Sequence, residues 1–284
     1  VENISDKVIL SSNKFGIKLF SEILKSEKDK NVFISPLSVS MALAMTYNGA
    51  NGVTKKAMAD TLELQDISIT DLNKSYDILQ RYLTGYDDKV TLNISNSLWL
   101  RKGEKLKESF VKNNEISYNA KLSELDFDSP DALKTINTWV SDSTNGKIKD
   151  LLKKIEPATF LYLINALYFK GAWTNTFDKA KTIETDFINN ENKTKKVQTM
   201  KASGEYQFYT HDKFRALSIP YGKGNIVMTI YLPKDGTTLD DFYKEFTDEN
   251  MKYWKTEFTK AKGELGLPRF KVEYENKLNQ VLKD

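Results

Sequence analysis

The feature that most constrains this fold is a segment, residues 39–45, that is apolar on nearly every side. Ser35-Pro36 comes just before it, and this pair is typical of a helix start, because serine can cap the first turn and proline suits the first helical position. Asn48-Gly49 marks the end of the predicted helix. A helix without a polar face needs cover on several sides, so we expect this one to lie inside the protein.

The composition is that of a globular protein with a large core. The chain has 284 residues, 40% of them hydrophobic and 29% charged, and a chain of this length buries roughly 75% of its unfolded surface. The net charge of +3 argues against nucleic acid or an anionic lipid surface as a partner. No cysteine is present, which excludes disulfides and Cys-ligated zinc, and we expect no metal and no cofactor. The longest dense apolar stretch, residues 160–169, is about half of a membrane span, so none is predicted.

Three further helices are predicted, each with one apolar stripe. The first stripe is Phe15, Leu19 and Ile23, and the second is Leu72, Tyr76, Leu79 and Leu83. Thr70 is the predicted cap of the second of these helices. The third helix is expected to open at Ser129-Pro130 and to stop at Asn145-Gly146.

Strand patterns lie between and after these helices. Residues 90–100 alternate with period two and carry one polar residue, Asn96, on the apolar face. Residues 160–169 are apolar apart from Asn165, which is typical of a strand covered on both faces, and we place this strand in the middle of a sheet. From about residue 180 the chain is mostly β, with a last strand at 266–274 and two short helices near 239–246 and 249–254. Without a linker, a repeat or a break in composition, the pattern predicts one domain of class α+β.

The residues offer little for catalysis. His211 is the single histidine, it lies in a polar context that looks like a turn, and no Gly-x-Ser-x-Gly motif accompanies it. Gly222-Lys223-Gly224-Asn225 is explained by a hairpin turn, and the paired acids Asp87-Asp88 look like turn residues. We therefore do not expect an enzyme.

Polar residues inside apolar segments are the more informative pattern. Ser35 and Ser38 start the buried helix, and Asn165 interrupts the apolar strand. A buried hydroxyl or amide without a partner costs on the order of 1–3 kcal/mol, so such residues either find structural partners or serve a part that moves. Taken alone, the structural explanation is the more frequent of the two.

The segment 31–52, Asn-Val-Phe-Ile-Ser-Pro-Leu-Ser-Val-Ser-Met-Ala-Leu-Ala-Met-Thr-Tyr-Asn-Gly-Ala-Asn-Gly, closely resembles the serpins, the serine protease inhibitor superfamily. The resemblance continues in the family's order through the whole chain. It is carried further by residues 137–140, 144–150, 163–173, 197–200, 219–221, 231–233 and 267–270.

The resemblance implies an α+β fold of three β-sheets, with a large central sheet surrounded by about eight or nine helices. It also implies a function: a serine-type endopeptidase inhibitor that acts as a suicide substrate, its reactive-centre loop being cleaved and inserted into the central sheet. The partner is then a target protease, and the compartment extracellular or the cell surface, with the cytoplasm as the alternative. A non-inhibitory serpin-fold binding or carrier protein is the alternative function.

Residue by residue, the resemblance implies two moving regions. The shutter, where the strands of the central sheet part, would contain Ser35, Pro36, Ser38 and Asn165. The breach, where a loop first enters the sheet, would contain Lys170, Gly171 and Trp173. Gly49 and Gly52 resemble tight-turn residues of the family, and none of these positions is catalytic.

The chain departs from the family's pattern at its end. Serpins normally continue past the helix containing Leu278 and Leu282 into another central-sheet strand, the reactive loop and the last strands, whereas this sequence stops at Asp284. We expect one serpin domain, residues 1–284, without the reactive bond, and a companion C-terminal polypeptide that completes the fold, or else a fragment. The absence of Cys and the abundance of Lys, Asn and Ile resemble a prokaryotic member from a warm habitat.

Overall fold

Helix α2, Pro36–Tyr47, is the segment that the sequence predicts to be interior, and the structure confirms it. The computed structural model describes residues 3–28, 30–85, 87–189, 191 and 193–283. The Ser38 amide donates a hydrogen bond to Ser35 Oγ at 3.3 Å, which caps the first turn. Met41 and Met45 are completely buried, as expected of a helix without a polar face.

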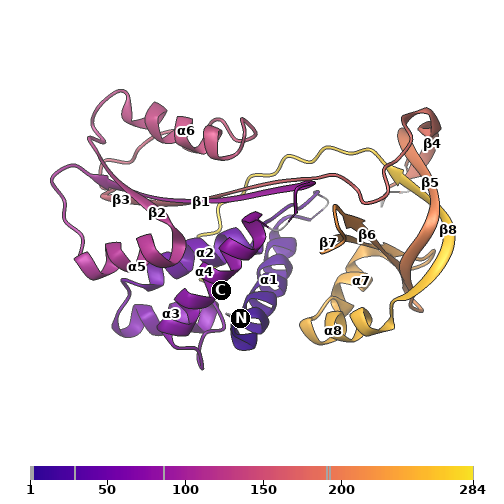
Figure 1. The fold of residues 1–284 in the computed structure, drawn as a ribbon, viewed down its shortest axis with the longest axis horizontal. Coiled ribbons are helices and arrows are strands. Elements are labelled where there is room, and N and C mark those ends of the chain that lie inside the picture. The colour runs from indigo at the N-terminus through magenta and orange to yellow at the C-terminus, as the bar shows by residue number, and fades with distance from the viewer. Residues whose placement is uncertain (1–2, 29, 86, 190, 192, 284) are drawn as a thin grey trace.

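Together with α2, five other helices cover the two faces of one sheet (Figure 1). Helices α1 (Asp6–Ser26), α3 (Gly52–Thr61), α4 (Ile69–Gly85) and α5 (Glu108–Tyr118) lie with α2 on one side, and α6 (Ala132–Ser143) lies on the other. The stripes of α1 and α4 are confirmed except at Leu83, since their other residues join one core, whereas Ile136 and Val140 of α6 are buried in a second core on the other side of the sheet (Figure 1). The side chains buried in the first core include Phe15, Leu19, Ile23, Met41, Leu72, Tyr76 and Leu98.

The predicted cap of α4 is wrong by two residues. Ser68, not Thr70, holds the first turn: the Asp71 amide donates to Ser68 Oγ at 3.0 Å, and the Ser68 hydroxyl donates to Asp71 Oδ2 at 2.7 Å. This reciprocal pair satisfies one of the free N–H groups of the first turn and adds a charge-assisted bond, so the helix begins one residue earlier than Thr70.

The sheet between these helices contains β1 (Val90–Arg101), β2 (Ala120–Leu125) and β3 (Leu161–Gly171), in the order β2-β1-β3. Strand β1 runs parallel to β2 and antiparallel to β3. The prediction that residues 160–169 lie mid-sheet is wrong for the part of the chain described, where β3 is an edge strand. The apolar run indicates that both faces of β3 are covered by other elements, and α6 and α2 cover them. It does not indicate whether a strand pairs with β3 on each of its two edges.

The second sheet is formed by the later part of the chain. Its strands are β4 (Ile183–Ile188), β5 (Thr194–Thr210), β6 (Phe214–Tyr221), β7 (Ile226–Pro233) and β8 (Thr259–Pro268). Strand β5 pairs in succession with β4, β8 and β6, so these strands are one sheet, and the described residues form two sheets where three are predicted. The 3₁₀ helix η1 (Lys179–Lys181) precedes β4, and helices α7 (Leu239–Glu245) and α8 (Asp248–Glu257) follow β7.

The predicted strand at 266–274 ends at Pro268 in the structure. Residues 269–276 have no regular structure, and Phe270 is 69% exposed. A strand needs a neighbour for its backbone N–H and C=O groups, and none of the described strands pairs with this segment. The chain returns from β8 to the helices around α2, where Tyr274 and Leu278 pack on the core (Figure 1).

Within the residues described, no helix combines the length and the apolar character needed to cross a membrane.

Glu63 provides a test of how α1 is attached to the segment after α3. Its carboxylate forms ion pairs with Lys14 and Lys18 of α1, and the Glu63 side chain is 7% exposed. Burial acts to raise the pKa of Glu63, but the hydrogen bonds from the two lysines outweigh it, so the pKa lies below its ordinary value. A lowered pKa in the folded state stabilises the fold above about pH 5, and this contribution is lost as the pH falls through the lowered pKa.

We therefore expect Glu63→Gln to lower the free energy of unfolding by about 1 kcal/mol at neutral pH, and the difference from wild type to shrink towards about pH 3. Urea denaturation at several pH values measures this. Asp60→Asn is the control, because its ion pair with Lys56 is exposed and should contribute less. A pH-independent difference would contradict the assignment.

Candidate conformational switch

Three of the predicted shutter residues lie together at the start of α2. The Ser35 hydroxyl donates to Ser38 Oγ at 3.0 Å, and both side chains are half-buried. Pro36 lies against α1 at Gly16, where an added Cβ would come within 3.0 Å of the Pro36 ring. The start of α2 is thus held by its own serine pair and by a close approach of α1.

Asn165, the fourth residue, lies over the middle of α2. It faces Asn96 in the β1–β3 register, and its Nδ2 donates to Asn96 Oδ1 at 2.7 Å. The same nitrogen lies 3.8 Å from Met41 Sδ. No hydrogen bond joins Asn165 to Ser35 or Ser38 in the described structure, so the four residues form two adjacent sites on α2.

Asn165 is one end of a buried chain of amides. Asn96, which is 3% exposed, donates through Nδ2 to Gln80 Oε1 at 3.0 Å and to the Tyr118 carbonyl at 2.7 Å. The chain continues from Tyr118 Oη to Asn73 Oδ1 (2.8 Å), from Asn73 Nδ2 to Asn48 Oδ1 (2.8 Å), from Asn48 Nδ2 to Asn114 Oδ1 (3.1 Å) and from Asn114 Nδ2 to the Met45 carbonyl (3.3 Å). We call it the amide chain.

The amide chain links five elements through the core. It begins on β3 and β1, passes α4 and α5, and ends at the C-terminal turn of α2. Burial raises the pKa of the Tyr118 hydroxyl well above its ordinary value, so this group remains a neutral donor. Because each link is a directional bond in an apolar surrounding, displacing one member leaves its neighbours unpaired.

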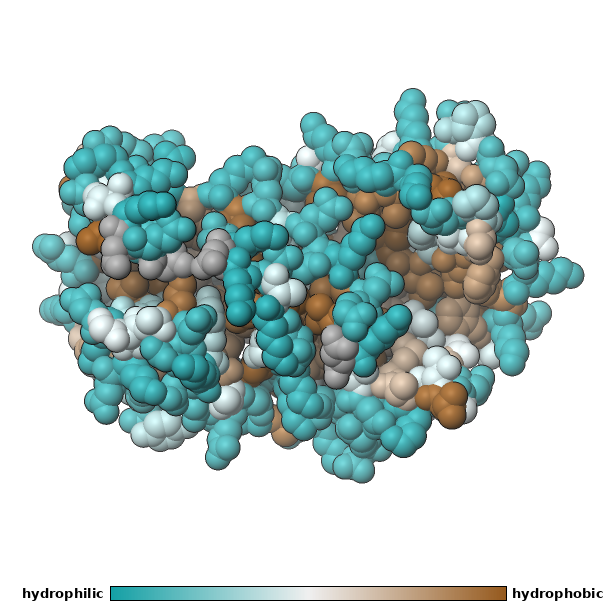
Figure 2. Space-filling model, turned by 180° about the vertical axis from the view of Figure 1, so that it is seen from behind, coloured by the Kyte–Doolittle hydropathy of each residue, from teal (hydrophilic) through white to brown (hydrophobic). Residues whose placement is uncertain are grey.

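One hydrogen-bond acceptor in the amide chain has no partner among the described residues. Asn165 Oδ1 is buried and accepts no hydrogen bond within the described residues. It belongs to β3, whose outer edge has no neighbouring strand there. Figure 2 shows apolar residues gathered in a hollow on the half of the molecule that holds this sheet. An unsatisfied amide oxygen beside a free strand edge is a site where a donor from an added segment would be stabilised.

One residue of the amide chain, Asn96, has a signal in the sequence. Asn96 stands on the apolar face of an alternating strand, where a polar side chain needs a buried partner. Asn73 and Asn114 lie on helices and Asn48 is the C-cap of α2, and they give no such signal, because asparagine at these positions is equally compatible with solvent. Their convergence depends on how three helices pack together.

The predicted breach residues lie where β3 ends. Trp173 stacks on Tyr221 of β6 with ring centroids 4.3 Å apart and an interplanar angle of 14°. A Cβ at Gly171 would lie 2.6 Å from Tyr221 Cδ1, so glycine allows this ring to lie against the strand. Lys170 is exposed, and its side chain forms no hydrogen bond or ion pair with described residues. The structure therefore brings Gly171 and Trp173 together, but not Lys170.

The two glycines expected at turns are required for different reasons. Gly52 has φ +56°, a left-handed conformation, at the start of α3. Gly49 lacks a positive φ, but a Cβ there would lie 2.9 Å from the Phe110 ring. Space, rather than backbone conformation, therefore favours glycine at position 49.

His211 lies in the turn between β5 and β6. Its ring stacks on Phe214 with centroids 4.7 Å apart, and its Nδ1 accepts from the Lys213 amide at 3.3 Å. In the part of the chain that the structure describes, no serine, threonine or carboxylate forms a hydrogen bond with it. No group of three or more His, Asp or Glu among those residues could hold a metal ion.

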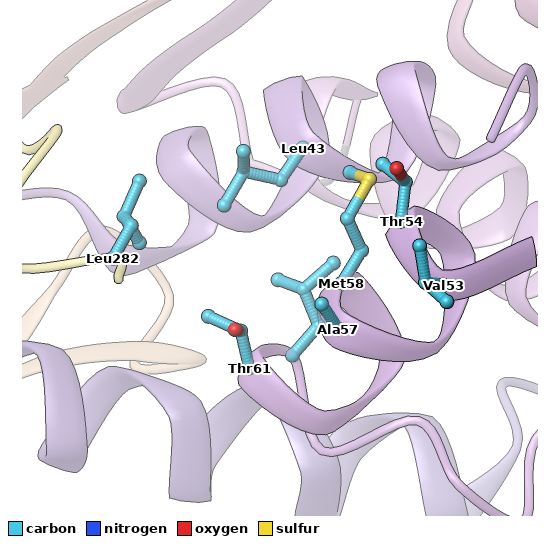
Figure 3. A pocket seen from close by; sticks show the side chains of 8 residues that line it. Leu43, Val53, Thr54, Ala57, Met58, Thr61 and Leu282 are labelled. Atoms are coloured by element: carbon cyan, nitrogen blue, oxygen red, sulfur yellow. The ribbon is translucent and has the colours of Figure 1, made fainter. Parts of the chain in front are cut away.

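A groove of about 450 Å³ lies away from both regions (Figure 3). It is lined by Leu43 of α2, by one face of α3 including Ala57 and Met58, and by Leu282. Its lining is almost entirely apolar and carries no titratable group, so it offers no chemistry to the site described above.

Comparison with known proteins assigns the family. The model of the family "Serpin (serine protease inhibitor)" matches residues 10–284. Leukocyte elastase inhibitor A of Rattus norvegicus is 32% identical over 284 residues, which cover 96% of this chain and 74% of that protein.

Two solved structures show the same fold. Ovalbumin from emu (Dromaius novaehollandiae) aligns with a TM-score of 0.93 at 26% identity, over 97% of this chain and 76% of that chain. The thermophilic serpin tengpin in its latent state aligns with a TM-score of 0.89 at 32% identity, over 99% and 76% of the two chains. The chain belongs to the serpin family, and its mixed α+β architecture with eight α-helices in the described residues is the serpin fold.

Replacement of Asn96 tests the amide chain. Asn96→Ala leaves Gln80 Oε1, the Tyr118 carbonyl and Asn165 Nδ2 without their partner, so we expect the free energy of unfolding to fall by about 1–3 kcal/mol. Chemical denaturation measures it. Asn93→Ala on the same strand is the matched control, because Asn93 is exposed and should change stability by less than about 0.5 kcal/mol. Equal changes in the free energy of unfolding for the two variants would show that the amide chain does not contribute to stability.

Proposed function

We propose that this protein inhibits an endopeptidase of the serine class by acting as a suicide substrate. The observation that carries the proposal is the unpaired Asn165 Oδ1 on β3, a strand whose outer edge has no neighbour among the described residues. Family membership supports it, because the family model is described as serine protease inhibitor and one relative is named as an elastase inhibitor.

The chemistry required is that of an interrupted hydrolysis. The protease serine oxygen attacks the carbonyl of a reactive bond, the new amine leaves, and an ester joins protease and inhibitor. Insertion of the cleaved loop beside β3 would then move the ester away from the protease's catalytic groups before water hydrolyses it. The stored free energy of a kinetically trapped fold drives such a step.

The shutter residues would act through exchange of hydrogen-bond partners. Asn165 already holds one partner, Asn96, and keeps its second group, Oδ1, free for a donor that an added strand brings. The Ser35–Ser38 pair would relax at the start of α2 as β3 moves. Apolar substitutes could not exchange partners, so polar side chains are appropriate to a part that opens.

The breach residues would guide entry of the loop. Trp173 and Tyr221 form a flat stacked surface just beyond the end of β3. Lys170 is exposed near the end of this strand and would contact an entering segment.

The free edge of β3 also supports the proposal that a further segment completes this single domain. Phe270 is exposed on a stretch without a partner strand, and Val227 and Leu232 are exposed on β7. A later segment or a companion polypeptide that pairs there would cover these apolar side chains. The reactive bond would lie on that polypeptide.

The experiment is incubation of the purified protein, together with the segment that carries the reactive bond, with trypsin-like, chymotrypsin-like and elastase-like proteases, followed by denaturing electrophoresis. We expect a covalent complex that survives denaturation with one of them, and loss of that protease's activity. The same protease with its catalytic serine blocked is the control and should form no complex. Denaturing mass spectrometry of the starting sample shows whether a second polypeptide accompanies the 32.6 kDa chain.

Cleavage of the protein without a stable complex would contradict inhibition and support the second candidate, a non-inhibitory serpin-fold binding or carrier protein. We further propose an extracellular or cell-surface location, as the resemblance to the family suggests. The similarity to tengpin, described as thermophilic, supports a prokaryotic origin in a warm habitat.

A further inference from the structure

The two sheets meet at one junction, formed by the start of β1, the end of β3 and the turn between β6 and β7. The Gly222 amide donates to the Ala172 carbonyl at 2.8 Å, and the Thr174 amide donates to the Pro220 carbonyl at 2.9 Å. The Ala172 amide donates in turn to the Lys89 carbonyl at 3.1 Å. Backbone bonds therefore connect three segments that are far apart in the sequence.

Asp87 binds two of these segments with one carboxylate. Its Oδ1 accepts from the Lys89 amide at 2.9 Å, at the start of β1, and its Oδ2 accepts from the Lys223 amide at 2.6 Å, in the β6–β7 turn. Both are charge-assisted bonds to backbone N–H groups, which are about twice as strong as neutral ones. Asp87 is half-buried, so water competes for them only in part.

The turn is shaped to receive this carboxylate. Gly222 has φ +51°, and a Cβ there would lie 2.2 Å from Asp87 Oδ2. No other residue could bring the turn so close to Asp87. The neighbouring acid acts differently: Asp88 is exposed and pairs through its side chain with Lys223 Nζ at 2.9 Å, which lowers the pKa of Asp88.

The position of the turn determines the position of Tyr221. Tyr221 directly precedes Gly222, stacks on Trp173 and contacts the Phe169 ring with centroids 5.1 Å apart. A second contact joins the helices of the three-stranded sheet to those of the five-stranded sheet, where Phe20 of α1 meets Tyr243 and Phe246. The ring pairs of that second contact are not hydrogen bonds, whereas the bonds of Asp87 are directional.

We propose that Asp87 is a positioning residue that holds the β6–β7 turn against the ends of β1 and β3 and thereby slows movement of the three-stranded sheet relative to the five-stranded sheet. The proposal rests on the proposed function, because that movement is what insertion of a strand beside β3 requires. Release of the two bonds of Asp87 would be part of the barrier to conversion.

The test compares Asp87→Ala with Asp88→Ala in the protein that includes the segment carrying the reactive loop. Hydrogen exchange of the Lys223 and Lys89 amides reports the bonds of Asp87 directly, and we expect their protection to fall roughly tenfold in Asp87→Ala only. The rate of conversion to the inserted form on mild heating, followed by native electrophoresis, should rise roughly tenfold in the same variant. Asp87→Asn, which keeps one carbonyl acceptor, should recover part of both effects.

Each outcome decides a separate point. Unchanged exchange in Asp87→Ala overturns the role of Asp87 in the junction. Lower protection with an unchanged conversion rate overturns the positioning role and leaves the proposed function standing. If the wild-type protein neither converts nor forms a protease complex, the proposed function fails and the role of Asp87 in conversion fails with it, while the exchange data still decide whether the bonds exist.

Discussion

The hydrogen bond between Asn165 and Asn96 is the interaction on which the rest of this structure most depends. It joins β3 to β1 at the side-chain level and connects the sheet to α4, α5 and α2 through the buried amides that follow. Directional bonds in an apolar core fix the relative positions of their donors more strictly than apolar packing does. The helices below the sheet are therefore coupled to the strand at its edge.

The amide chain contains one unpaired acceptor. Every described buried side-chain polar atom has a partner except Asn165 Oδ1, and that atom lies on the strand whose edge is free. A fold selected only for stability would satisfy or remove such a group, since it costs on the order of 1–3 kcal/mol. Under the proposed function, a strand added beside β3 would supply the missing donor, which gives a reason to keep this group.

The middle and the C-terminal end of β3 would have opposite effects under the proposed function. Near the middle, Asn165 has an unpaired buried acceptor that a new neighbouring strand would satisfy. At its end, Asp87, Gly222 and the Trp173–Tyr221 stack hold the three-stranded sheet against the other sheet. Under the proposals made above, polar complementarity would favour insertion and the junction would slow it.

The sequence alone determined most of the local structure, because helix and strand periods, caps and turn residues are local properties. Residues 36–47 as a buried helix, the alternating strand around Asn96 and the Gly222 turn all follow from such patterns. The family could also be recognised from the Asn31–Gly52 segment. The tertiary structure decided which strand lies at the edge, that residues 269–276 have no strand partner, and that Asp87 meets Lys223 across 136 positions of sequence. These depend on lateral neighbours and on the packing of distant segments, and a one-dimensional pattern of apolar and polar residues does not encode either.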